Sequence, residues 1–184
     1  MICVVMGIPG VGKTTVLNAA ADKADVEIVN FGTVMFEEAR KKDIVQDRDQ
    51  MRKLPGEVQR ELQKNAAAAI RLRAREGNLI VDTHASIKTP KGYLPGMPEA
   101  VVRALDPDSF VLVEVDEQEI YDRRNKDASR VRDDDTLEAI AEHQMINRCF
   151  VSTYAELSNA MVLIVKNEAG KAEEAGAKVA ALFK

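Results

Sequence analysis

Short apolar runs alternate along the chain with longer segments whose apolar residues recur every three to four positions. The apolar runs predict β-strands at residues 2–6, 26–30, 78–82, 109–114 and 161–165. The longer segments predict helices at residues 13–21, 34–42, 55–77, 117–124, 135–158 and 170–183. This alternation is typical of an α/β fold in which helices flank a five-stranded parallel sheet. Residues 31–33 and the proline- and glycine-rich residues 83–98 are expected to be loops.

The first apolar run leads directly into a glycine-rich segment, Gly7-Ile8-Pro9-Gly10-Val11-Gly12-Lys13-Thr14-Thr15. This segment has the pattern Gly-x-x-x-x-Gly-Lys-Thr of a phosphate-binding loop, in which backbone N–H groups surround nucleotide phosphates. The pattern predicts a P-loop NTPase fold in which Lys13 reaches the β and γ phosphates and Thr14 binds Mg²⁺. A glycine turn without a ligand is the alternative. The apolar run before the segment and the helical pattern after it favour nucleotide binding.

Polar residues follow the second and third predicted strands, and in a parallel sheet they share one edge with the phosphate-binding loop. Asp82 ends the third apolar run, where its carboxylate can face the magnesium ion held by Thr14. The alternative role for Asp82 is to start the following turn. Glu114 and Asp116, at the end of the fourth run, are competing candidates for the metal. His84 and His143 lack the spacing of metal ligands.

Two groups of basic residues interrupt an otherwise acidic chain. The first joins two predicted helices and contains Arg123, Arg124, Lys126, Arg130 and Arg132. We interpret residues 124–134 as a lid in which Arg124, Arg130 and Arg132 are catalytic, because phosphoryl transfer requires cationic donors and exclusion of water. A solvated charged face is the alternative.

The second basic group follows the second predicted strand and comprises Arg40, Lys41, Lys42, Arg48, Arg52 and Lys53. It could bind the phosphate of another substrate. The interleaved aspartates allow the alternative of surface ion pairs, which contribute little energy.

Size, charge and cysteine content restrict the class of protein further. The 184 residues suffice for one domain with its own core, and the net charge of -4 predicts no general affinity for nucleic acid or for membranes. Cys3 and Cys149 are expected to be reduced thiols in the core. No apolar run has the length of a membrane span, so we expect a cytoplasmic protein.

Several blocks in a fixed order resemble archaeal-type adenylate kinases. Besides residues 7–15, four blocks lie in the first half of the chain: Val-Asn-Phe-Gly-Thr-Val-Met at 29–35, Asp-Arg-Asp-Gln-Met-Arg-Lys-Leu at 47–54, Val-Asp-Thr-His at 81–84 and Lys-Thr-Pro-Lys-Gly-Tyr-Leu-Pro-Gly at 88–96. Three blocks follow in the second half: Ser-Arg-Val-Arg-Asp at 129–133, Glu-His-Gln at 142–144 and Asn-Arg at 147–148. One departure lies in the lid, where Ala-Ser-Arg-Val-Arg at residues 128–132 stands in place of the more usual Thr-Thr-Arg-Asn-Arg or Ala-Thr-Arg-Asn-Arg.

The resemblance implies reversible, Mg²⁺-dependent phosphoryl transfer in which ATP and AMP give two ADP. It also implies a nucleoside monophosphate kinase fold with a helical AMP-binding region at residues 33–76, a short lid and a homotrimeric assembly. By the same resemblance residues 7–15 hold ATP, and the AMP site comprises Gly32, Thr33, Arg40, Arg48, Arg52, Asp82 and His84.

Two other functions stay open at this point. A small P-loop kinase acting on CMP, UMP or a cofactor precursor would share these motifs, because the sequence does not fix the selectivity for the base. A nucleotide-binding module without catalysis is the alternative from another class of protein. It would be expected to have a damaged phosphate-binding loop or a lid without arginines, and the sequence has neither.

Overall fold

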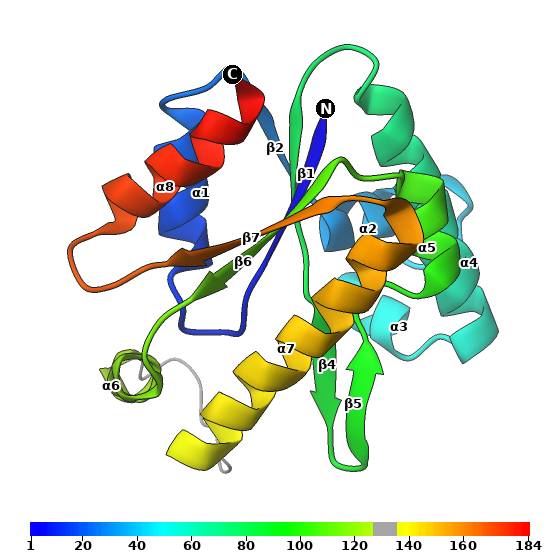
Figure 1. Ribbon diagram of the computed structural model, residues 1–184. Coiled ribbons are helices and arrows are strands. Elements are labelled where there is room, and N and C mark those ends of the chain that lie inside the picture. The colour runs from blue at the N-terminus through cyan, green and yellow to red at the C-terminus, as the bar shows by residue number, and fades with distance from the viewer. Residues whose placement is uncertain (127–135) are drawn as a thin grey trace.

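The computed structural model describes residues 1–126 and 136–184, except the side chain of Arg52. Within these residues a five-stranded parallel sheet has the strand order β2-β3-β1-β6-β7 (Figure 1). Its strands are β1 (Ile2–Met6), β2 (Glu27–Asn30), β3 (Leu79–Asp82), β6 (Ser109–Glu114) and β7 (Met161–Lys166). The predicted α/β fold with five parallel strands is therefore confirmed.

Helices cover both faces of this sheet, as Figure 1 shows. One core joins Ile2, Val4 and Met6 of β1 to α2 (Phe31–Lys41), α4 (Gly56–Arg73), α5 (Glu99–Leu105) and α7 (Leu137–Ser158). The other joins Cys3 and Val5 to α1 (Lys13–Ala21), α6 (Glu117–Lys126) and α8 (Ala172–Ala180), after which a 3₁₀ turn spans Ala181–Phe183. Successive side chains of a strand point to opposite faces, so a central strand with apolar residues throughout is buried on both sides.

Several local predictions are wrong. Residues 31–33 form the first turn of α2 rather than a loop, because the Asn30 side chain caps the helix by accepting a hydrogen bond from Thr33 N at 3.0 Å. The helix predicted to reach residue 77 ends at Arg73. The short helices α3 (Arg48–Arg52) and α5 were not predicted. Cys149 is exposed rather than in the core, whereas Cys3 is buried as expected.

The segment predicted as a loop contains an antiparallel hairpin, β4 (Ser86–Thr89) and β5 (Gly92–Pro95). Its prolines do not break the ladder, because Pro90 lies in the turn and Pro95 ends the second strand. Gly92 has a φ of 125°, which favours glycine, and its carbonyl accepts a hydrogen bond from Thr89 Oγ1 at 2.8 Å.

None of the helices in the described ranges has the length and the apolar composition that crossing a membrane requires.

Candidate active site

The glycine-rich loop connects the buried strand β1 to the N-terminus of α1. Gly10 and Gly12 have φ values of 96° and 79°, in a region that side chains with a Cβ rarely adopt. Helix α1 begins at Lys13 directly after this turn. The unpaired N–H groups and the partial positive charge of a helix N-terminus therefore face the end of the sheet, where they favour a phosphate.

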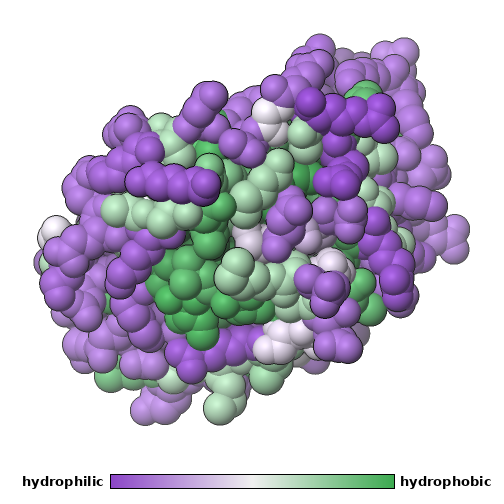
Figure 2. Space-filling view, turned by 45° about the horizontal axis from the view of Figure 1, so that its top comes forward, coloured by the Kyte–Doolittle hydropathy of each residue, from purple (hydrophilic) through white to green (hydrophobic). Residues whose placement is uncertain are grey.

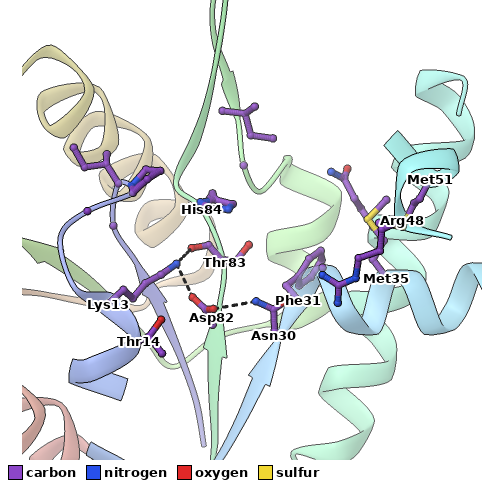
Figure 3. A pocket seen from close by; sticks show the side chains of 18 of the residues that line it. Lys13, Thr14, Asn30, Phe31, Met35, Arg48, Met51, Asp82, Thr83 and His84 are labelled. Atoms are coloured by element: carbon purple, nitrogen blue, oxygen red, sulfur yellow. Dashed lines mark hydrogen bonds and ion pairs between the residues drawn. The ribbon is translucent and has the colours of Figure 1, made fainter. Parts of the chain in front are cut away.

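Lys13 and Asp82 meet at the carboxyl ends of β1 and β3. Lys13 Nζ lies 2.5 Å from Asp82 Oδ1 and donates a hydrogen bond to the carbonyl oxygen of Thr83 at 2.6 Å. The pair lies beside Thr14 in Figure 3. This arrangement places an ammonium group, a carboxylate and a hydroxyl group together.

Glu114, one of the two competing metal candidates, has other partners. Arg148 donates two hydrogen bonds to its carboxylate, at 2.7 and 2.6 Å, and Lys166 donates one at 3.0 Å. Burial raises the pKa of Glu114, but these hydrogen bonds and charges outweigh burial and hold the pKa below its ordinary value. Asp116, the other competing candidate, accepts a hydrogen bond from Gln118 N at 2.9 Å. Of these three acidic positions, only Asp82 shares a cavity with Lys13 and Thr14 in the described part of the chain.

A chain of polar contacts continues from Asp82 to α3. Asn30 Nδ2 donates to Asp82 Oδ2 at 3.0 Å, since Asn30 and Asp82 are register partners at the ends of β2 and β3. The Thr33 hydroxyl donates to Asn30 Oδ1 at 3.2 Å and accepts from Arg48 Nη2 at 2.7 Å. The contacts thus extend from Lys13 to Arg48.

Except for Thr33, these groups line one cavity of about 790 Å³. Figure 3 shows Lys13 and Thr14 on one side, Arg48, Met35 and Met51 on the other, and Asp82, Thr83 and His84 between them. Desolvation within the cavity, followed by the charge of Lys13, lowers the pKa of His84 below its ordinary value, so its imidazole is neutral near pH 7. The cavity thus combines a phosphate-binding loop with a second wall that carries a cation and apolar side chains.

Arg124 lies in the last turn of α6 and contacts the phosphate-binding loop. Its Nε and Nη2 atoms donate to the carbonyl oxygen of Pro9 at 2.8 and 2.7 Å. The lid predicted over residues 124–134 therefore begins within a helix, and residues 127–135 lie outside the described part of the chain.

Comparisons with known proteins identify the family. A family model described as "AAA domain" matches residues 6–141. The adenylate kinase of Thermoplasma acidophilum is 49% identical over 172 residues, which cover 94% of this chain and 92% of the relative. The adenylate kinase of Methanocaldococcus jannaschii is 52% identical over 171 residues, which cover 90% of this chain and 89% of the relative. The chain belongs to the archaeal-type adenylate kinase family.

A solved structure independently supports the fold of this adenylate kinase family member. The shikimate kinase from Bacteroides thetaiotaomicron superposes with a TM-score of 0.61 at 16% sequence identity, covering 99% of this chain and 97% of that structure. At this identity the likeness concerns the fold alone.

The cavity contains many of the residues that the sequence of this adenylate kinase family member singled out. From the predicted nucleotide sites these are Gly7, Ile8, Pro9, Gly10, Gly12, Lys13, Thr14, Gly32, Arg48, Asp82 and His84. Val11 is buried beneath the loop, and Thr15 is exposed on α1. Thr33 reaches the site through its bond to Arg48.

Five predicted arginines are not assigned to the cavity. Arg124 contacts the phosphate-binding loop from α6, and the side chain of Arg52 is not described. Arg40 lies with its Cζ atom 6.0 Å from the ring centroid of Phe36, and Arg48 approaches the same ring at 5.9 Å. Arg130 and Arg132 lie outside the described residues.

In the rest of the second basic group, Lys41 pairs with Glu38 at 2.6 Å and Lys42 with Glu61 at 3.3 Å. These two lysines form surface ion pairs, but with glutamates and not with the interleaved aspartates of the prediction.

Sequence reasoning missed several residues of the cavity wall. These are Asn30, Phe31, Met35, Met51, Gln59, Gln63 and Ile87. The position of Asn30 at the carboxyl end of a parallel strand could have identified it. The others come from helices and a hairpin whose orientation depends on tertiary packing.

Proposed function

We propose that this protein catalyses reversible, Mg²⁺-dependent phosphoryl transfer from ATP to AMP, giving two ADP. The observation that carries the proposal is a single cavity of about 790 Å³ with the phosphate-binding loop on one wall and Arg48 on the other. Two nucleotides whose phosphates meet in such a cavity satisfy the geometry of direct transfer. The names of relatives about half identical over nearly the whole chain support ATP and AMP as the pair.

In the proposed reaction an oxygen of the AMP phosphate attacks the γ phosphorus of ATP in line. The new P–O bond forms as the bond to the β-phosphate oxygen breaks, and ADP leaves with the electron pair. No general base is needed, because the attacking phosphate oxygen is ionised near neutral pH. The protein contributes alignment and positive charge, with Lys13 on the ATP side and Arg48 on the AMP side.

The donor set of the cavity fits Mg²⁺. The Thr14 hydroxyl and the Asp82 carboxylate both line it, and oxygen ligands are those that Mg²⁺ prefers. These two groups would hold the ion, which neutralises phosphate charge when bound. Asp82 also holds Lys13 in place through the contact of 2.5 Å.

The remaining assignments of the proposal follow the family. We assign residues 33–76 to the AMP side and residues 124–134 to a lid, within a single domain over residues 1–184. The AMP side carries Gly32, Thr33, Arg40, Arg48 and Arg52, bordered by Asp82 and His84. The lid contributes Arg130 and Arg132. A cytoplasmic location suits the free thiols of Cys3 and Cys149.

The substrate assignment is tested with a panel of monophosphates. Purified protein with Mg²⁺-ATP is offered AMP, CMP, UMP and GMP, and ADP formation is followed by a coupled assay. We expect kcat/KM for AMP to exceed the values for the others by about a hundredfold or more. A higher value for CMP or UMP would assign a different kinase activity, and ATP binding without transfer to any acceptor would indicate a binding module.

We also propose a homo-oligomer, a trimer by family resemblance, that uses the edge of the sheet at β7. Met161, Val162 and Ile164 on this edge strand are 58%, 40% and 43% exposed. Figure 2 shows a hydrophobic area surrounded by hydrophilic surface. Such an edge favours association with another chain.

For the oligomer, we expect Ile164→Glu to shift the molar mass measured by light scattering from trimer to monomer, because a buried charge would destabilise the interface. Ile28→Glu is the matched control, since Ile28 is 36% exposed on the opposite edge strand β2. A trimer that survives Ile164→Glu, or a monomeric unmodified protein, would contradict this proposal.

A further inference from the structure

Asn167 connects four parts of the structure behind the phosphate-binding loop. It directly follows β7 and is only 4% exposed. Its backbone N–H donates to the carbonyl of Glu114 at the end of β6 at 2.8 Å, and its own carbonyl accepts from Arg123 Nη2 of α6 at 2.9 Å. Its side-chain Nδ2 donates to the carbonyl of Val11 at 2.6 Å. The backbone bonds fix the residue, and the side chain is directed at the loop.

The carbonyl of Val11 accepts a second hydrogen bond from the same region. Arg123 Nη1 donates to it at 3.1 Å, while Nη2 of Arg123 also pairs with Glu119 at 2.8 Å. A carbonyl oxygen has two lone pairs, so these two donors satisfy it fully. The Val11 carbonyl is thereby held against the body of the protein.

This tether sets the direction of the next N–H group. In a planar trans peptide the C=O of one residue and the N–H of the next point to opposite sides. With the Val11 carbonyl held toward Asn167, the N–H of Gly12 faces the other way, and Gly12 lines the cavity. The contact is close, because a Cβ on Gly12 would lie 2.4 Å from Asn167 Nδ2.

We infer that Asn167 is a positioning residue for the reaction: by holding the Val11 carbonyl, its side-chain amide orients the Gly12 N–H toward the phosphates of the bound nucleotide. A preoriented donor costs no reorganisation when the anion binds. We expect the effect to concern the binding of the ATP phosphates, because the hydrogen bond acts on the phosphate-binding loop and not on α2 or α3, which form the AMP side. The identity of the nucleotide in this inference rests on the proposed function. The role of Asn167 in phosphate binding does not.

The test replaces the amide with an apolar group of similar size. In Asn167→Leu we expect the dissociation constant of inorganic tripolyphosphate, measured by calorimetry, and the KM for ATP each to rise about tenfold. The KM for AMP should stay within about twofold of the unmodified value. If Asn167→Leu does not fold, Asn167→Asp is measured in the same way at pH 8, since it keeps the shape and the backbone bonds.

Gln144→Met is the matched control. Gln144 is another buried amide, 8% exposed, whose Nε2 donates to the carbonyl of Val115 at 3.0 Å. Its loss should lower the midpoint of thermal unfolding without changing tripolyphosphate affinity. Unchanged affinity in the Asn167 variants, or an equal rise of the KM for ATP and AMP, would overturn the inference. If the unmodified protein lacks AMP kinase activity, the proposed function is wrong. The affinity for tripolyphosphate still tests the role of Asn167 in that case.

Discussion

Replacing Lys13 with methionine is expected to lower kcat for phosphoryl transfer by about a thousandfold, because it removes the cation of the phosphate-binding loop. Methionine keeps the length of the aliphatic chain, so the loop keeps most of its packing. The Lys13 ammonium group lies 2.5 Å from Asp82 and 2.6 Å from the Thr83 carbonyl oxygen, at the junction of the proposed ATP and metal positions. The measurement is kcat at saturating ATP and AMP in a coupled assay.

Lys23→Met provides the control for Lys13→Met. Lys23 follows the C-terminus of the same helix and pairs with Glu173 of α8. Its replacement should leave kcat within about twofold of the unmodified enzyme, because a surface ion pair contributes little energy. More than a tenth of the original kcat in Lys13→Met would remove the lysine from the mechanism.

The sequence identified the central strands because they are buried on both faces. Every residue of β1 is fully buried, so the strand appears as an unbroken apolar run. The hairpin β4–β5 has no unbroken apolar run, since its residues are mostly exposed, and its prolines are typical of loops. Local composition therefore predicted the sheet but not the element that extends from it.

The residues of the site divide in a similar way. Lys13, Thr14 and Asp82 could be predicted because a local motif or a strand end places them at one sheet edge. The contacts of Asn167 with Val11 and of Arg124 with Pro9 join positions 156 and 115 residues apart. Such contacts depend on how α6 and the end of β7 pack against the loop. They cannot be predicted from the spacing of residues within one segment. For the same reason the sequence left Glu114 and Asp116 as competing candidates to Asp82 for the metal.

The basic segment after α6 is expected to supply the other large catalytic contribution. Arg124 in the last turn of α6 contacts Pro9 of the phosphate-binding loop, and Pro9 lines the cavity. Arg130 is six positions beyond Arg124 in the sequence, and a span of six residues is at most roughly 20 Å. This separation in the sequence is compatible with the proposed catalytic role of Arg130.

Replacing Arg130 with alanine should therefore lower kcat by at least about a hundredfold while changing nucleotide affinity much less, because the lost guanidinium acts on charge that develops in the transition state. Stopped-flow single turnovers and equilibrium ATP binding separate the two effects. Arg130→Lys should recover only part of the rate, since lysine keeps the charge but lacks the planar donor fork. Lys126→Ala removes one charge of the same basic group at the last residue of α6 and should retain kcat within about twofold. An equal loss in Lys126→Ala would attribute the effect to net charge, and an Arg130→Ala variant with more than a tenth of the original turnover would contradict the catalytic role.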